Sequence, residues 1–104
     1  MVKQFEVYLI NFDPTTGSEI KKTRPCIVIS PNDMHGLNTV IIAPMTSTCK
    51  LYPTRIPVLF EKKEGYIILD QIRTVDKLRL ERMLGTIEKE TTHHVLKTLQ
   101  EMFA

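Results

Sequence analysis

The chain has 104 residues, a mass of 12.0 kDa, 42% apolar and 25% charged residues, and a formal net charge of +2. This composition excludes a disordered chain and is typical of a folded domain with one modest core, so we expect a single domain over residues 1–104. The low net charge excludes a polycationic binder of nucleic acid, so any anion site must come from local clustering of cations.

Short strands separated by turn residues dominate the first four-fifths of the chain. Runs rich in β-branched and aromatic residues end at proline-containing turns, and Pro57 within the fourth run predicts an edge strand or a bulge. The predicted strands cover residues 6–12, 26–30, 39–43, 55–60, 66–69 and 80–87, with a short helical turn at 77–79. Many short strands at close spacing predict a mainly β fold, either a small barrel or a sandwich.

The end of the chain has a helical pattern. Glu88 and Glu90 place carboxylates where they favour the positive end of a helix dipole. The apolar residues that follow keep a helical period and form one stripe, which consists of Val95, Leu96, Leu99, Met102 and Phe103. We expect a C-terminal α-helix that packs on the β structure.

Neither a membrane segment nor a disulfide framework is expected. No apolar stretch approaches the ~20 residues that span a bilayer, and Glu6 occupies the place where a secretory signal has its apolar run. Cys26 and Cys49 lack the spacing of a redox or metal motif, so two free thiols are the simpler interpretation. We therefore expect a cytoplasmic protein without membrane contact.

Three cations lie within four residues just before a buried strand. Arg24 is the last exposed position before the apolar run at 26–29, so its backbone is anchored while its guanidinium stays free and permanently charged. Together with Lys21 and Lys22 it can clamp a phosphate group of nucleic acid. A solvated surface loop is the commoner explanation of such a pattern taken alone.

A cluster of hydroxyl groups follows the third predicted strand. The side chains of Thr46, Ser47 and Thr48 can hydrogen-bond a phosphate oxygen or a base edge. The alternative is a turn in which these hydroxyls satisfy their own backbone.

The segment D-Q-I-R-T-V-D at 70–76 places acid, amide and base together at the exit of a strand. Strand alternation predicts that Gln71 and Arg73 share a face, where they can contact single-stranded bases. The alternative is a surface ion pair of Arg73 with Asp70 or Asp76, which contributes little stability.

No motif in the chain predicts a metal or a cofactor. His93 and His94 are neighbours on the predicted helix and point ~100° apart, which makes ligation of one metal ion difficult. These two and His35 are interpreted as solvated histidines, and any catalysis is expected to proceed without metal. Cys26 has no histidine or acid at a motif spacing, so a thiol nucleophile has little support.

Taken together, these segments resemble the MazF/PemK family of toxin endoribonucleases. The resemblance rests on D-P-T-T-G-S-E at 13–19, T-R-P at 23–25, P-M-T-S at 44–47 and D-Q-I-R-T-V-D at 70–76. The closing strand and the amphipathic helix also fit, so the match spans nearly the whole chain.

The resemblance implies a mainly β, SH3-like barrel (MazF/Kid/CcdB-like) with a C-terminal α-helix, assembled as a homodimer. It implies metal-independent cleavage of single-stranded RNA that leaves a 2′,3′-cyclic phosphate and a 5′-hydroxyl. It also implies a cognate, MazE-like antitoxin whose flexible tail occupies the RNA groove.

Arg24 and Thr46 fall on the catalytic positions of the family. The groups expected to contact RNA or support the site are Ser18, Glu19, Lys21, Lys22, Ser47, Asp70, Gln71 and Arg73. Two positions depart from the pattern of some members, because Ser18 replaces a histidine and Ile68 replaces an arginine, so a proton shuttle built on those two groups is unavailable. Asp70 or Glu19 remains open as a base, and both can instead position other groups.

Two other functions are compatible with the same fold. A CcdB-like gyrase-targeting toxin binds a protein and cuts no RNA, although the T-R-P and D-Q-I-R-T segments argue against it. A non-catalytic SH3-like nucleic-acid-binding module predicts binding without cleavage products.

Overall fold

The computed structural model describes residues 1–12 and 23–104. In these residues the strands are β1 (Glu6–Asn11), β2 (Thr23–Val28), β3 (Thr39–Thr46), β4 (Arg55–Phe60), β5 (Lys63–Ile68), β6 (Arg73–Asp76) and β7 (Leu80–Thr86), followed by helix α1 (Lys89–Met102). Single turns of 3₁₀ helix connect some of them: η1 (Asn32–Met34), η2 (Leu69–Gln71) and η3 (Lys77–Arg79). The predicted helical turn at 77–79 is confirmed.

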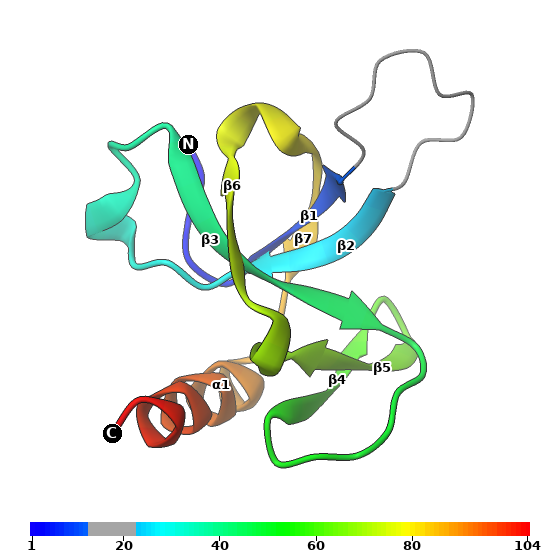
Figure 1. Ribbon diagram of the computed structural model, residues 1–104. Coiled ribbons are helices and arrows are strands. Elements are labelled where there is room, and N and C mark those ends of the chain that lie inside the picture. Colours follow the sequence, from blue (N-terminus) through cyan, green and yellow to red (C-terminus); the bar gives the residue numbers. More distant parts are fainter. Residues whose placement is uncertain (13–22) are drawn as a thin grey trace.

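Strand β3 joins two groups of strands into one curled sheet (Figure 1). Its first half pairs with β6 and its last two residues pair with β5, while its other edge pairs with β2. The sheet order is β4-β5-β3-β2-β1-β7, which places β4 at an edge, as Pro57 predicts. The result is a half-barrel with α1 against β4, so the predicted small barrel with a C-terminal helix is confirmed.

Two prolines lie inside strands that were predicted to start after or end before them. Pro25 pairs with Leu9 of β1, so β2 begins at Thr23 rather than at residue 26. Pro44 pairs with Cys26, and β3 continues to Thr46 rather than ending at residue 43. On the outer edge of β3, Pro44 falls between the stretch paired with β6 and the stretch paired with β5. The missing N–H of Pro44 therefore removes no ladder bond to either of those strands.

The apolar run at 26–29 is continuous because both faces of β2 are buried. Cys26 and Val28 lie in one core cluster with Val40, while Ile27 and Ile29 lie in a second cluster. Alternating side chains of one strand point to opposite faces, so burial on both faces removes the apolar–polar alternation of a half-exposed strand.

Helix α1 contributes Val95, Leu99 and Met102 to the core, at the spacing that the sequence predicts. The predicted stripe is wrong for Leu96 and Phe103, which are 38% and 72% exposed. Leu96 follows Val95 by ~100° around the helix and Phe103 lies beyond its last residue, so neither shares the buried face. Within residues 1–12 and 23–104, no helix is long and apolar enough to cross a membrane.

His35 is buried, so the interpretation of a solvated side chain is wrong at this position. Its Nδ1 lies 3.0 Å from the carbonyl oxygen of Val2, and its Nε2 lies 2.9 Å from Oγ of Ser30. Since a carbonyl only accepts, Nδ1 carries a proton, and in the neutral ring Ser30 donates to Nε2. His93 and His94 are exposed, as expected.

Candidate functional site

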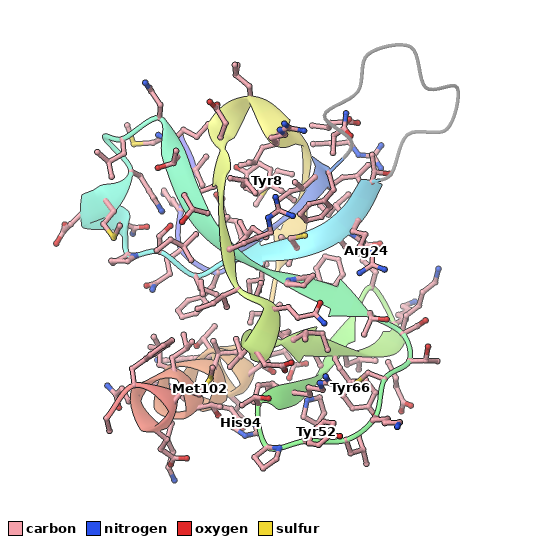
Figure 2. All side chains as sticks on the ribbon, in the orientation of Figure 1. Tyr8, Arg24, Tyr52, Tyr66, His94 and Met102 are labelled. Carbon is pink, nitrogen blue, oxygen red and sulfur yellow. The ribbon has the colours of Figure 1, made fainter. Side chains whose placement is uncertain are left out.

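Arg24 lies at the start of β2 and Thr46 at the end of β3, and both line the same two pockets. The pairing of β2 with β3 ends at Cys26 and Pro44, two residues from Arg24 and from Thr46, and residues two apart on a strand share a face. Opposite residues of an antiparallel pair lie on the same face. Figure 2 shows Arg24 at the start of β2, beside the end of β3.

Two adjoining pockets share Arg24 and Thr46 as lining residues. The larger has a volume of about 340 Å³ and the smaller a volume of about 190 Å³. The larger is lined by Arg24, Pro25, Met45, Thr46, Ser47, Val58, Phe60, Lys63 and Gly65. The smaller is lined by Arg24, Pro44, Thr46, Thr48, Cys49, Arg55, Ile68 and Gln71. Arg24 and Thr46 therefore form the rim between them.

The guanidinium of Arg24 has no ion-pair partner among residues 1–12 and 23–104. Its side chain is exposed, and the ion pair found in the described residues joins Arg55 to Asp70 instead. A guanidinium presents parallel N–H donors that match two oxygens of one phosphate group. Arg24 thus meets the geometric requirement for a phosphate ligand at the rim.

The hydroxyl of Thr46 is engaged by its own turn. Its Oγ1 donates to the carbonyl oxygen of Thr48 at 3.0 Å and accepts from the Thr48 N–H at 3.4 Å. This matches the self-satisfied turn considered as the alternative from the sequence. Thr46 donates to a phosphate oxygen only if the phosphate replaces the Thr48 carbonyl.

Asp70 is held by a clamp that the sequence did not predict. Arg55 donates from Nε to Oδ1 at 3.3 Å and from Nη2 to Oδ2 at 3.2 Å, and Thr54 donates to Oδ1 at 2.9 Å. Arg55 also donates to the Lys50 carbonyl at 2.9 Å and lies 4.7 Å above the ring of Tyr52. Asp70 therefore fixes Arg55 at the edge of the smaller pocket.

The same clamp makes Asp70 a poor general base. The hydrogen bond from Arg55, followed by that from Thr54, lowers the pKa of Asp70 below its usual value. A proton acceptor in catalysis works best when its pKa lies near the working pH. The role that this geometry favours for Asp70 is positional.

The ion pair makes the acid stability of the protein depend on Asp70. A carboxyl whose pKa is lowered in the folded state stabilises that state above its unfolded pKa of about 3.9, and the contribution is lost as the pH falls through the folded value. Asp70→Asn should therefore melt below the wild type at pH 7. Thermal melts between pH 7 and pH 2.5 should show this difference shrinking as Asp70 becomes protonated. An offset that stays constant over the whole series would contradict the depressed pKa.

Gln71 and Arg73 do not share a face, so that prediction is wrong. The 3₁₀ turn η2 ends at Gln71 and interrupts the strand alternation before β6 begins. Gln71 lines the smaller pocket of the rim, whereas Arg73 lies 5.1 Å above the ring of Phe12 in another pocket of about 200 Å³. The alternative ion pair of Arg73 is also absent from the described residues, where Asp70 binds Arg55 and Asp76 accepts from the Leu78 N–H.

A family model for PemK-like, MazF-like toxins of type II toxin–antitoxin systems matches residues 3–103. The chain belongs to this family. The match confirms the resemblance found in the sequence, and it means that the rim lies in a toxin of a toxin–antitoxin pair.

Solved structures share the fold of this chain over nearly its whole length. An endoribonuclease from a mycobacterial species, solved with its cognate antitoxin, is 20% identical, with a TM-score of 0.83 over 99% of this chain and 95% of its own. MazF from Deinococcus radiodurans is 24% identical, with a TM-score of 0.79 over 98% of this chain and 96% of its own. Toxin MazF-mt6 of Mycobacterium tuberculosis is 19% identical, with a TM-score of 0.77 over 94% of this chain and 95% of its own.

The other predicted site residues of the toxin divide into two groups. Ser47 is exposed and lines the larger pocket. Ser18, Glu19, Lys21 and Lys22 lie outside the described residues. Sequence reasoning missed Arg55, Phe60 and Lys63, because each reaches the rim through strand pairing and belongs to no local motif.

Within residues 1–12 and 23–104 there is no group of three or more His, Cys, Asp or Glu side chains that could hold a metal ion.

The two cysteines of the toxin differ in reactivity. Both are free, Cys26 is buried and Cys49 is partly exposed. Burial raises the pKa of the Cys26 thiol to about 12, although Arg24 and Arg73 oppose the shift. A thiol with so high a pKa holds almost no thiolate at neutral pH, which excludes Cys26 as a nucleophile there.

Alkylation of the native toxin should therefore modify one thiol. Treatment with iodoacetamide at pH 8 is expected to label Cys49, and labelling of Cys26 should require denaturant. Mass spectrometry of the intact chain and its peptides measures both. Rapid native labelling of Cys26 would contradict the burial of its side chain.

Proposed function

We propose that this toxin is a metal-independent endoribonuclease that cleaves single-stranded RNA at short sequences, acts in the cytoplasm, folds residues 1–104 as one domain, and is neutralised by a cognate antitoxin. The observation that carries the proposal is the position of Arg24 on the rim between two pockets. A phosphodiester on that rim has one pocket for the nucleoside on each side. A similar protein of the same fold is an endoribonuclease solved with its cognate antitoxin, which supports the assignment.

Cleavage of RNA through its own 2′-hydroxyl has three requirements. A base removes the 2′-proton, a cation stabilises the charged phosphorane, and an acid protonates the leaving 5′-oxygen. The 2′-oxygen forms a bond to phosphorus as the bond to the 5′-oxygen breaks, which leaves a 2′,3′-cyclic phosphate and a 5′-hydroxyl. Each requirement can be compared with the groups at the rim.

Arg24 fulfils the second requirement. Its guanidinium stays charged at neutral pH and can hold two non-bridging oxygens while negative charge develops on them. A guanidinium is a permanent cation with no acceptor for a proton, so Arg24 is a poor base. Thr46 can orient the phosphate once its hydroxyl leaves the Thr48 carbonyl. We assign no general base, so alignment and charge stabilisation account for the rate in this proposal.

The other groups position the substrate in this proposal. Gln71 and Arg55 line the smaller pocket, where they offer an amide and a second guanidinium to the nucleoside there. Ser47 offers a hydroxyl from the larger pocket. Arg73, in its separate pocket with Phe12, contacts RNA farther along the strand.

Two protein partners belong to the proposal. A second copy of the chain forms a homodimer, and a MazE-like antitoxin covers the rim of the inactive toxin. MazE–MazF complexes of Deinococcus radiodurans with the same fold support an antitoxin partner, at 23% identity and a TM-score of 0.82 for one of them.

Incubation of the purified toxin with a long RNA, followed by mapping of the new 5′ ends, tests the function. We expect cuts at a short recurring sequence, 5′-hydroxyl ends, and undiminished activity in excess chelator. Binding without cuts would favour a non-catalytic SH3-like module. Intact RNA together with inhibition of gyrase would favour a CcdB-like toxin.

A further inference from the structure

We propose that the larger pocket binds the nucleobase on one side of the cleaved bond, with Phe60 as its stacking surface and Lys63 as a hydrogen-bond donor that selects a keto base. This inference rests on the proposed function and adds to it a pair of residues that determine sequence specificity. Both residues come from the hairpin of β4 and β5, which no local motif of the sequence marked as part of the site.

The lining of the larger pocket fits a flat, partly apolar ligand. Its volume of about 340 Å³ lies within the ~300–1,000 Å³ of small-molecule sites. Pro25, Met45, Val58 and Phe60 supply apolar surface, while Lys63 supplies a cation. Single-stranded RNA is commonly bound by stacking of bases on aromatic side chains, with polar groups at the base edges.

The hairpin places Phe60 and Lys63 side by side. They are register partners that flank a two-residue turn of Glu61 and Lys62, whose φ angles are 51° and 64°. Two successive positive φ angles are the mark of a type I′ turn, the tight connection that fits the twist of paired strands. The turn therefore places Lys63 directly opposite Phe60 on the same face of the hairpin.

The ring of Phe60 is supported by β7. Gly85 of β7 carries no side chain, and a Cβ built there would meet ring carbons of Phe60 at 3.3 and 3.4 Å. The ring thus packs against bare backbone and against the core cluster that contains Val58. A ring held in this way loses little freedom when a base stacks on it.

Lys63 gives the pocket its preference among bases. An ammonium group only donates hydrogen bonds. Guanine presents O6 beside N7 and uracil presents O4 as acceptors, whereas adenine presents an amino donor beside its N7 and cytosine presents an amino donor at the corresponding edge. A keto base, guanine or uracil, is therefore favoured at one position next to the cleaved bond.

The test is a comparison of cleavage sites in a random-sequence RNA pool for wild type, Lys63→Gln and Phe60→Leu. Lys63→Gln should lose the keto preference at one position beside the cut and keep the preferences at the others. Phe60→Leu should lower kcat/KM by ~5- to 150-fold, the range for loss of stacking on one base. Lys97→Gln, an exposed lysine of α1 outside both pockets, is the matched control and should cleave as the wild type does.

The outcomes that would overturn this inference can be told apart from those that would overturn the proposed function. Wild-type toxin that cuts no RNA overturns both. Wild-type toxin that cuts, with an unchanged sequence profile for Lys63→Gln, overturns the base subsite alone. A uniform loss at every sequence, with a weaker dependence on salt, would make Lys63 a phosphate ligand and also overturn the subsite. Thermal melts confirm that Phe60→Leu is folded, and Lys63→Gln changes an exposed side chain.

Discussion

Arg24→Ala is expected to fold as the wild type does and to cleave RNA about 10²- to 10³-fold more slowly, the usual loss when one donor to a developing oxyanion is removed. The side chain of Arg24 is exposed, so its truncation leaves no cavity in the core. The loss should fall mainly on kcat, because the charge on the phosphate oxygens grows in the transition state. Single-turnover cleavage of a short RNA measures the rate of the chemical step directly.

Two variants serve as controls for this result. Arg24→Lys keeps the charge and loses the planar fork of donors, so it should recover only part of the rate. Arg82→Ala removes an exposed arginine of β7 that lies outside both pockets, and its rate should match the wild type. Equal losses for Arg24→Ala and Arg82→Ala would mean that overall charge, rather than a placed guanidinium, drives the reaction.

Gly65→Ala should reduce cleavage although it removes no side chain that contacts RNA. A Cβ at Gly65 would lie 2.8 Å from the carbonyl oxygen of Thr46, a contact with backbone that forces one strand to move. Thr46 pairs with Tyr66 at the end of β3, so the movement displaces the rim itself. We expect a rate loss on the order of 10- to 100-fold and a destabilisation of about 1–3 kcal/mol, from misplacement and overpacking respectively.

Gly36→Ala is the matched control, because a Cβ at Gly36 meets nothing within 4 Å. Cleavage assays and chemical denaturation of both variants should show wild-type behaviour for Gly36→Ala. Full activity in Gly65→Ala would mean that the position of the Thr46 backbone does not limit the reaction.

Much of the fold follows from local sequence signals. Turn residues and runs of β-branched residues predicted most strands, and the period of the apolar residues predicted α1. The errors occur where tertiary pairing overrides local preference, as at Pro44, which continues a strand because the outer edge of β3 changes partners there. Leu96 was counted in the apolar stripe, but it lies ~100° around the helix from the buried Val95, outside the narrow face that packs on the sheet.

The site was predicted less completely than the fold. Arg24 and Thr46 were singled out as polar groups beside apolar strands and were assigned to the site through the family resemblance, and both line the two pockets. The clamp between Arg55 and Asp70 spans fifteen positions, and it depends on the pairing of Arg55 with Ile68 across β4 and β5. No local pattern carries that information. The loop positions Ser18 to Lys22 lie outside the described residues and remain predictions.

Cleavage of an RNA with a single phosphorothioate at the cut site tests most directly whether Arg24 holds the scissile phosphate. Sulfur in place of one non-bridging oxygen weakens a hydrogen bond from a guanidinium, and the two diastereomers present sulfur to different sides. Wild-type toxin should cleave one diastereomer much more slowly than the other, and Arg24→Ala should cleave both at similar low rates. The same diastereomer ratio in both proteins would contradict contact between Arg24 and that phosphate.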